Sequence, residues 1–492
     1  MTGRNRIKFL RRGEVVELAQ LAPMRTLLDY LRLGEASRGT KEGCGEGDCG
    51  ACTVSLGSLK DGRLVYEPVN ACILLLGQVD GKDVVTVDDL SRGGKLHPIQ
   101  QAMVETHGSQ CGFCTPGFVM SLFALYQSDV AADRQTVVDQ VAGNLCRCTG
   151  YRPIIEAALA ACTGSPDDAW SRARAETAQA LARLDDGSDI FIGDETAFFA
   201  APASDAALAQ LTAQHPDAVL LAGATDVGLW ITKQLRDIGK IIHLGRLSSL
   251  RRVEDTIDAV RLGAAVTYAE AERALGDIDP DLTELLRRLG SKQVRASGTI
   301  GGNIANGSPI GDTPPALIAL GAELELRKGA TMRRIALEDF FIAYGKQDRA
   351  PDEIVASVSI PRLRRDEAFR CYKITKRFDQ DISSVLGAFK FTIAARRVTG
   401  ARIAYGGMAA TPKRALKTET AAHSLSLDDP AGWEAAADCL AQDFQPIGDH
   451  RASAGYRAET ARALFIKALT EISGMPTRAT RVTGFRELVD AG

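Results

Sequence analysis

Eight of the eleven cysteines in this 492-residue chain form two groups of four within the first third of the sequence. The first group is Cys44, Cys49, Cys52 and Cys72, and the second is Cys111, Cys114, Cys146 and Cys148. In a reducing compartment, cysteines clustered in this way bind metal more often than they form disulfides. We therefore expect two sites with four thiolate ligands each, and we expect the rest of the chain to use what those sites hold.

The spacing of the first group favours iron over zinc, the other common metal with four thiolate ligands. Three of its cysteines lie in one loop with the C-x4-C-x2-C spacing of plant-type ferredoxins, and Cys72 supplies the fourth thiol. Zinc knuckles usually combine two close pairs instead. Glycines at positions 43, 45, 47 and 50 allow backbone N–H groups to turn toward sulfur. For the second group, C-x2-C and C-x-C, a structural zinc site stays open as an alternative.

Charge and hydropathy limit the partners of the chain. The net charge is −3, which leaves no basic excess for nucleic acid. The N-terminus lacks the apolar run of a signal peptide, and no stretch reaches the roughly 18–20 apolar residues that span a bilayer. We expect a cytoplasmic protein that binds neither nucleic acid nor a membrane. The remaining cysteines, Cys162, Cys371 and Cys439, are expected to be small buried hydrophobic residues.

Changes in apolar periodicity predict several domains. Residues 1–90 have a strand hairpin over 6–18 and a small α+β pattern around the first cysteine loop. Residues 91–163 have a helical period, with helices predicted over 98–106, 116–127, 134–145 and 151–161. A linker with one exposed helix is predicted over 164–189. Strands and helices alternate over 190–365, and strands followed by Ala-rich helices make up 366–492.

Two glycine-rich segments stand out after residue 190. One is the strand and turn around Leu-Leu-Ala-Gly-Ala-Thr-Asp at 220–226, and the other spans 296–312. Neither is a G-x-G-x-x-G motif, so a classical dinucleotide fold is not predicted, and each alone could be an ordinary loop. Together they indicate phosphate binding. Gly301 and Gly302 would let backbone amides approach a pyrophosphate, and Asn303, Ser308 and Asp312 offer polar side chains.

No catalytic residue is predicted. The six histidines are dispersed, and no Ser/His/Asp or Gly-x-Ser-x-Gly pattern occurs. The basic run Arg362–Arg365 is expected to be a solvated face. A minority interpretation places it near an anionic nicotinamide nucleotide, because Lys373, Lys376 and Arg377 follow soon after.

Three strings resemble the iron–sulfur part of the molybdenum hydroxylases: Cys44-Gly-Glu-Gly-Asp-Cys-Gly-Ala-Cys52, Gln110-Cys-Gly-Phe-Cys-Thr-Pro-Gly117 and Asn144-Leu-Cys-Arg-Cys-Thr-Gly-Tyr-Arg-Pro153. The resemblance covers roughly residues 5–475. It implies a multidomain α+β fold with two [2Fe-2S] clusters. The domains would be a β-grasp plant-type ferredoxin domain, a four-helix [2Fe-2S] domain, an α+β FAD-binding domain of the vanillyl-alcohol-oxidase-like type and a C-terminal α+β domain like the carbon monoxide dehydrogenase flavoprotein.

The same resemblance extends to FAD. The segments 220–227 and 299–303 look like the family's FAD motifs, and Tyr405-Gly-Gly-Met-Ala409 with Pro412 and Arg414 matches its C-terminal flavoprotein unit. One position departs, because animal members have an aromatic residue in the flavin pocket where this chain has Leu289. The residues that the resemblance assigns to FAD are Leu220, Leu221, Ala222, Gly223, Ala224, Thr225, Asp226, Val227, Leu289, Thr299, Gly301, Gly302, Asn303, Asp312, Val355 and Lys373.

The resemblance implies an electron-transfer role. Electrons would leave molybdenum, cross the second and then the first cluster, reduce FAD and pass to NAD+. The family's molybdopterin domain lies after the flavin part, and this sequence ends at Gly492. We therefore expect molybdopterin on a large partner subunit, in an α2β2 heterotetramer, where the substrate is also selected. The alternatives are the same role for an aldehyde or N-heterocycle dehydrogenase, or a zinc-binding scaffold.

Overall fold

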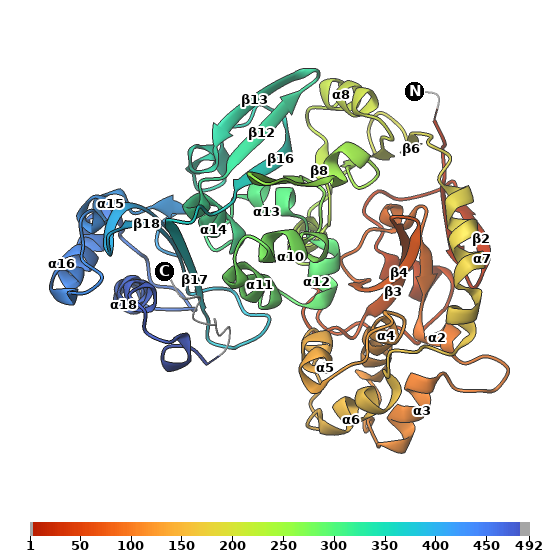
Figure 1. The fold of residues 1–492 in the computed structure, drawn as a ribbon. Coiled ribbons are helices and arrows are strands. Elements are labelled where there is room, and N and C mark those ends of the chain that lie inside the picture. Colours follow the sequence, from red (N-terminus) through yellow and green to blue (C-terminus); the bar gives the residue numbers. More distant parts are fainter. Residues whose placement is uncertain (1–2, 483–492) are drawn as a thin grey trace. The chain divides into compact units, whose positions relative to one another are not determined.

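The computed structural model describes residues 3–482 and divides into two compact units (Figure 1). The first unit contains the chain up to Ser248 together with Gly290–Gly298, and the second contains Ser249–Leu289 together with the chain from Thr299 onward. The segment that was predicted as one FAD-binding domain, 190–365, is therefore divided between the units. In the described residues no helix is both long enough and apolar enough to cross a membrane.

The first unit begins with a mixed five-stranded sheet that surrounds the first cysteine group. Its strands are ordered β2-β1-β5-β3-β4, with β1 and β5 parallel and the other neighbours antiparallel. The β1–β2 pair confirms the predicted hairpin. Short helices cover the sheet at α1 (Leu27–Asp29), Tyr30–Gly34, Leu76–Val79 and α2 (Val87–Leu90). The strands are β1 (Ile7–Arg11), β2 (Glu14–Leu18), β3 (Thr53–Lys60), β4 (Arg63–Asn70) and β5 (Asp83–Val85).

Four helices follow the sheet, as the helical period predicted. They are α3 (Pro98–Glu105), α4 (Thr115–Tyr126), α5 (Arg134–Val141) and α6 (Arg152–Ala161). Helix α4 is the central one, because every residue from Gly117 to Tyr126 is buried. Helix α5 ends at Val141, earlier than predicted, and the chain then turns before Cys146.

Helix α7 (Ala169–Leu184) corrects one prediction about the linker. The segment 164–189 does contain a single helix, but its Trp170, Leu181 and Leu184 are buried in the core that also holds α3 and α4. The guanidinium of Arg92 lies 4.2 Å from the ring centre of Trp170. The predicted exposed helix is therefore packed along one side.

A four-stranded sheet completes the first unit. Its order is β6-β7-β9-β8, with β9 parallel to both β7 and β8. The strands are β6 (Ile190–Gly193), β7 (Phe198–Ala201), β8 (Val219–Leu221) and β9 (Lys240–His243), and the helices are α8 (Asp205–Gln214), α9 (Val227–Thr232) and α12 (Lys292–Ser297). Helix α12 returns to this unit after the chain has passed through the second unit.

The second unit contains two antiparallel sheets. The first has the order β10-β11-β16-β12-β13, and the second has the order β17-β18-β19-β20. The first consists of β10 (Val253–Asp255), β11 (Ala259–Gly263), β12 (Glu323–Lys328), β13 (Thr331–Ala336) and β16 (Ile354–Pro361), with β14 (Phe341–Ala343) and β15 (Lys346–Gln347) as a separate pair. The second consists of β17 (Glu367–Ile374), β18 (Val385–Ala394), β19 (Arg397–Gly406) and β20 (Lys413–Arg414).

Helices pack on both sheets of this unit. Helix α14 is buried along its whole length, which explains its almost entirely apolar sequence. The helices are α10 (Tyr268–Gly276), α11 (Pro280–Arg287), α13 (Ile300–Asn306), α14 (Thr313–Leu320), α15 (Leu416–Ala422), α16 (Trp433–Asp438), α17 (Leu440–Asp443) and α18 (Ala454–Ile472), with 3-10 turns at Ser248–Arg251, Leu337–Phe340, Pro430–Gly432 and Thr477–Ala479.

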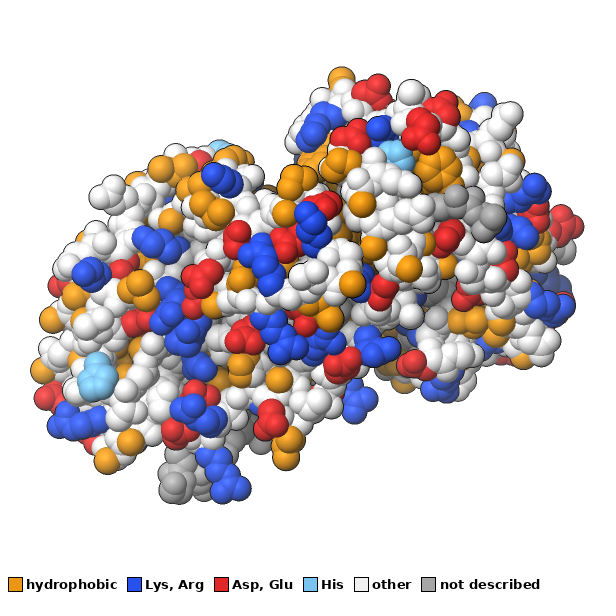
Figure 2. All heavy atoms as spheres, turned by 90° about the horizontal axis from the view of Figure 1, so that it is seen from above, with side chains coloured by type: hydrophobic (Ala, Val, Ile, Leu, Met, Phe, Trp, Pro, Cys, Tyr) orange, Lys and Arg blue, Asp and Glu red, His pale blue; other side chains and the backbone are white. Residues whose placement is uncertain are grey.

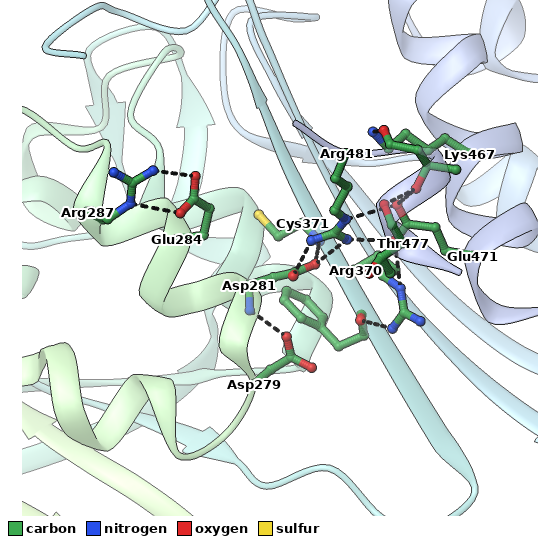
Figure 3. A network of polar contacts seen from close by, with 12 residues as sticks. Asp279, Asp281, Glu284, Arg287, Arg370, Cys371, Lys467, Glu471, Thr477 and Arg481 are labelled. Carbon is green, nitrogen blue, oxygen red and sulfur yellow. Dashed lines mark hydrogen bonds and ion pairs between the residues drawn. The ribbon is translucent and has the colours of Figure 1, made fainter. Parts of the chain in front are cut away.

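A buried ion network fixes the segment after α18 (Figure 3). Arg481 forms ion pairs with Asp281 of α11 at 2.6 Å and with Glu471 of α18 at 2.6 Å. Arg370 of β17 pairs with the same Glu471 at 3.0 Å. Elsewhere, on the face seen in Figure 2, Lys and Arg side chains lie among Asp and Glu side chains.

Candidate cofactor sites

The first cysteine group is assembled in the first unit from the loop before β3 and from the turn after β4. Its sulfurs approach in pairs. The backbone N–H of Cys44 donates to Cys49 Sγ at 3.3 Å, and Cys52 Sγ lies 3.2 Å from Cys72 Sγ. Cys52 and Cys72 are buried, while Cys44 and Cys49 are partly exposed. The glycines at 45, 47 and 50 all have positive φ, as the turning of this loop requires.

Backbone amides surround the sulfur of Cys44. The N–H groups of Glu46, Asp48 and Cys49 donate to Cys44 Sγ at 3.4, 3.4 and 3.3 Å. A hydrogen bond from the Cys49 side chain, together with these amides, lowers the pKa of Cys44 to about 4, although burial acts in the opposite direction. Cys44 is therefore prepared to be a thiolate, the form that binds metal.

The second cysteine group lies at helix ends of the four-helix domain. Cys111 and Cys114 precede α4, and Cys146 and Cys148 lie between α5 and α6. Cys111 shares a side-chain hydrogen bond with Cys148, and Cys114 shares one with Cys146. Cys146 is buried. Cys111 and Cys148 are exposed.

Polar neighbours orient Cys146. Its backbone N–H donates to Tyr151 Oη at 3.0 Å, and its Sγ lies 3.2 Å from Thr149 Oγ1. Burial acts to raise the pKa of Cys146, but hydrogen bonds from Thr149 and from the Cys148 amide outweigh it and bring the pKa to about 7. Cys146 is therefore about half ionised at neutral pH, whereas burial and a hydrogen bond with Cys146 raise the pKa of Cys114 to about 12.

The pairing of the sulfurs fits binuclear iron clusters. A [2Fe-2S] cluster is held by four cysteines, two on each iron. The side-chain hydrogen bonds pair Cys44 with Cys49, Cys52 with Cys72, Cys111 with Cys148, and Cys114 with Cys146. A structural zinc site instead brings four ligands around one ion. Among the described residues, no three or more His, Cys, Asp or Glu side chains form a group that could hold a metal ion, so the structure does not decide between zinc and iron.

The predicted FAD segment of the first unit follows β8 and packs closely. A Cβ on Gly223 would lie 1.9 Å from the Ser297 carbonyl oxygen, and a Cβ on Gly228 would lie 2.6 Å from the Ile73 carbonyl oxygen. Ala224 adopts φ 62°, which completes the turn. Gln78 Nε2 donates to the carbonyl of Ala222 at 3.0 Å. Both glycines are thus required for close packing.

These contacts place the segment 220–228 beside the first cysteine group. Ile73, against which Gly228 packs, directly follows Cys72. Lys233, just after α9, donates through Nζ to the carbonyl of Cys44 and lies 3.7 Å from the Glu46 carboxylate. No sequence pattern predicts a role for Lys233, because a single lysine after a short helix is an ordinary surface residue.

The second glycine-rich segment corrects an expectation. Thr299 caps α13, and its Oγ1 accepts from the Gly302 N–H at 3.0 Å. The N–H of Gly301 donates to the Ala264 carbonyl at 3.0 Å, and a Cβ on Gly301 would lie 2.4 Å from Ala264 Cβ. The amide of Gly301 is therefore not available to a pyrophosphate, and this glycine serves packing. Gly302 is exposed, and a Cβ at this position would lie 2.8 Å from Thr299 Oγ1.

Three polar side chains of the second unit form a buried cluster. Lys373 of β17 forms an ion pair with Asp312, and its Nζ also donates to Ser383 Oγ at 2.9 Å. Ser383 donates in turn to Asp312. Lys373 and Asp312 were both predicted for FAD, whereas Ser383 was missed, because it lies in a loop without a motif. Arg288, which is distant in sequence, donates to the Lys373 carbonyl at 3.0 Å.

The other predicted FAD residues lie in different surroundings. Val355 is buried in β16, and Leu289 packs at the edge of the same core. Asn303 Oδ1 accepts from Thr313 Oγ1 at 2.6 Å. The candidates are divided between units: 220–227 belongs to the first, and Leu289, Thr299, Gly301, Gly302, Asn303, Asp312, Val355 and Lys373 belong to the second.

Comparison with known domain families assigns most of the chain. Residues 86–159 match the [2Fe-2S] binding domain, residues 195–363 match the FAD binding domain in molybdopterin dehydrogenase, and residues 370–472 match the CO dehydrogenase flavoprotein C-terminal domain. The chain therefore carries the iron–sulfur and FAD domains of the molybdenum hydroxylases, a family of oxidoreductases.

Among individual proteins, the chain is similar to the xanthine dehydrogenase of Emericella nidulans, with 32% identity over 94% of this chain and 38% of the relative. It spans little more than a third of that relative. A carbon monoxide dehydrogenase chain from Hydrogenophaga pseudoflava aligns with a TM-score of 0.52 and 25% identity, over 55% of this chain and 95% of that chain. Quinoline 2-oxidoreductase from Pseudomonas putida 86 shares the fold, with a TM-score of 0.51, 22% identity and coverage of 56% and 95%.

Proposed function

We propose that this chain is the iron–sulfur and FAD electron-transfer subunit of a xanthine dehydrogenase, with domains at 1–90, 91–163, 190–365 and 366–492. When bound, two [2Fe-2S] clusters and FAD supply one- and two-electron transfer from a molybdenum site on a large molybdopterin-binding partner to NAD+. The overall reaction is xanthine, NAD+ and water to urate and NADH, part of purine catabolism, in a cytoplasmic α2β2 heterotetramer. The similarity to a xanthine dehydrogenase over 94% of the chain supports the substrate class.

The contact between the segment 220–228 and the first cysteine group is the observation that carries this proposal. Gly228 packs on Ile73, next to Cys72, and Lys233 binds the carbonyl of Cys44. A flavin held by that segment would lie next to the first cluster. The three amides on Cys44 Sγ contribute to the potential of this cluster, because hydrogen bonds to sulfur stabilise added negative charge.

The exposure of the second group supports its role as the entry point for electrons. Cys111 and Cys148 are exposed, and Phe113 and Leu145 beside them are 49% and 45% exposed. Apolar side chains around an exposed site favour contact with another chain. We propose that the molybdopterin-binding subunit covers this surface.

A related molybdenum hydroxylase is the second candidate. The fold shared with a carbon monoxide dehydrogenase and a quinoline 2-oxidoreductase supports it, because these proteins act on other substrates. The chain's own residues do not distinguish these substrates, since substrate selection belongs to the partner in this proposal. A zinc-binding scaffold is the remaining alternative.

The purified chain tests whether it carries out electron transfer while the partner subunit oxidises xanthine. It should contain about four irons and one FAD, reduce a dye with NADH and fail to oxidise xanthine. Co-expression with its large partner should add xanthine-dependent NADH formation. Two zinc ions and no visible absorption would favour the scaffold. Xanthine oxidation by the molybdenum-free chain would contradict the proposed role, and aldehyde or quinoline turnover by the complex would favour the second candidate.

A further inference from the structure

A buried network in the first unit joins the loops of both cysteine groups to helix α12. Gln293 of α12 is fully buried, and its Nε2 lies 3.1 Å from each of Thr53 Oγ1, Ser121 Oγ and Asn144 Oδ1. Thr53 directly follows Cys52, and Asn144 comes two residues before Cys146. Ser121 lies on α4, which begins directly after Cys114. One side-chain amide therefore contacts residues that adjoin both cysteine groups.

The surrounding groups fix the roles of the hydrogen bonds. The Thr53 hydroxyl donates to the Gly50 carbonyl at 2.7 Å, and the Ser121 hydroxyl donates to Asn144 Oδ1 at 2.6 Å. Both hydroxyl oxygens are then left as acceptors facing Gln293. Asn144 Nδ2 donates to the same Gly50 carbonyl at 3.0 Å. The position of Gln293 thus requires a group with two N–H donors, which a carboxylate or a thioether cannot supply.

The two cysteine loops are also in direct contact around this amide. The N–H of Leu145 donates to the Cys49 carbonyl at 3.0 Å. A Cβ on Gly143 would lie 2.1 Å from Gln293 Oε1, and a Cβ on Gly50 would lie 2.1 Å from the Gly143 carbonyl oxygen. These contacts leave no space for either loop to shift alone, so the position of one cysteine group determines the position of the other.

We propose that Gln293 is a positioning residue that sets the separation and orientation of the two clusters. This inference rests on the proposed function, in which both cysteine groups hold [2Fe-2S] clusters. Electron tunnelling weakens steeply with distance, so a fixed spacing between the cluster loops sustains rapid transfer. Helix α12 also contacts the predicted FAD segment, because Gly223 packs against the carbonyl of Ser297 at its end. The same short helix therefore contacts all three proposed cofactor sites of this unit.

Electron paramagnetic resonance of the dithionite-reduced full-length chain tests the inference. Two reduced clusters split each other's signals by dipolar coupling, which falls with the cube of their separation. Gln293→Met keeps the volume of the side chain but removes both donors. It should change the splitting and shift the reduction potentials of both clusters, while the iron content stays at that of the wild type. Lys292→Gln, the neighbouring partly exposed position on α12, should leave the splitting unchanged.

Ser121→Ala is the milder variant and decides the outcome if Gln293→Met fails to fold. It removes one acceptor of the Gln293 amide and should change the splitting in the same direction by a smaller amount. A merely structural role would lower the thermal midpoint without altering the splitting or the potentials. Wild-type splitting in an iron-replete Gln293→Met or Ser121→Ala chain would overturn the inference. Absence of iron from the wild-type chain would overturn the proposed function and this inference with it.

Discussion

At the scale of single residues, Asp83 of β5 is a buried carboxyl group whose charge is costly. Its Oδ2 accepts from Tyr66 Oη at 2.7 Å. Burial, with a further contribution from the charge of Asp89, raises the pKa of Asp83 from 3.8 to about 6. The folded state therefore binds this proton more tightly than the unfolded state. The free energy of unfolding falls as the pH rises from about 4 to about 6, and it stays lower above that window.

We predict that Asp83→Asn stabilises the chain at neutral pH. The asparagine keeps an acceptor for Tyr66 and carries no charge. At about 1.4 kcal/mol per pKa unit, the free energy of unfolding at pH 7 should rise by at most about 3 kcal/mol. Urea unfolding at pH 7 and near pH 4 measures this, and the difference from wild type should disappear at the lower pH. Asp61→Asn, at an exposed turn, is the control. An equal gain at both pH values would contradict the assignment.

Arg457 of α18 is a buried cation that holds two loops of the second unit. It donates to the carbonyl of Gly407 at 2.8 Å and to that of Ser384, and it pairs with Asp449 at 2.8 Å. We predict that Arg457→Met lowers the free energy of unfolding by about 3 kcal/mol, because buried acceptors lose their donor. FAD content should fall as well, because Ser384 adjoins the Lys373–Ser383 cluster. Arg462→Met, on the exposed side of the same helix, should cost less than about 1 kcal/mol. Similar losses in both variants would contradict this role.

Residue identity alone predicted which cysteines gather in space, but it predicted the environments of the candidate residues less well. The eight cysteines follow from a spacing that is typical of metal ligands, and the structure brings their sulfurs together in pairs, while their role as ligands stays a prediction. Cys162 and Cys371 are buried as expected, whereas Cys439 is only partly buried. The amide of Gly301 was expected to bind phosphate but is bonded to Ala264, a partner distant in sequence. Gln293 and Ser383 could not be predicted, because neither lies in a recognisable motif and both act through contacts between distant segments.

At the scale of elements, α9 brings the predicted FAD segment against the first cysteine group. We predict that Gly228→Ala destabilises the first unit by about 1–3 kcal/mol, because the added methyl group would lie 2.6 Å from the Ile73 carbonyl. The visible circular dichroism of the cluster proposed for the first cysteine group should change too. Gly455→Ala on α18 meets nothing within 4 Å and should stabilise by up to about 1 kcal/mol through helix propensity. A Gly228→Ala variant with unchanged stability and unchanged visible circular dichroism would contradict the close contact.

Elements with a strong period were predicted most reliably. The hairpin at 6–18 and the four helices of the second cysteine domain follow from local patterns that their packing reinforces. The end of α5 was misplaced, because Gly143 leaves the helix in order to contact Gln293 and the cysteine loop. The helix in 164–189 was predicted, but its packing was not, because its Ala- and Arg-rich sequence resembles an exposed helix while Trp170 anchors one end.

At the scale of the whole molecule, the order of domains along the chain does not match the two compact units. The segment 190–365 has one sequence pattern and one family match over 195–363, yet 190–248 and 290–298 belong to the first unit. Sequence reasoning assigns contiguous stretches to domains, so it could not predict that α12 returns to the cysteine-rich unit. That return is also what makes the contacts of Gln293 with Thr53, Ser121 and Asn144 possible.

The second unit is held together by the network around Arg481, which connects α11, β17 and α18 (Figure 3). Burial acts to raise the pKa of Glu471, but hydrogen bonds from Arg481 and Thr480 outweigh it and hold the pKa below 4.5. Because the folded pKa is lowered, this stabilisation is complete above about pH 4.5 and is lost as the pH falls through the folded pKa.

We predict that Arg481→Met lowers the free energy of unfolding of this unit by about 3 kcal/mol at pH 7, because it leaves Asp281 and Glu471 buried with one cation fewer. Since Arg481 joins α11, in the FAD-binding match, to α18, in the flavoprotein C-terminal match, the variant should also broaden the thermal transition of the second unit. Calorimetry at pH 7 and pH 3 measures both effects, and the loss should be smaller at pH 3. Arg478→Met, on an exposed neighbour in the same segment, is the control and should behave like the wild type. An unchanged transition in Arg481→Met would show that the two matched segments are held together by their apolar cores alone.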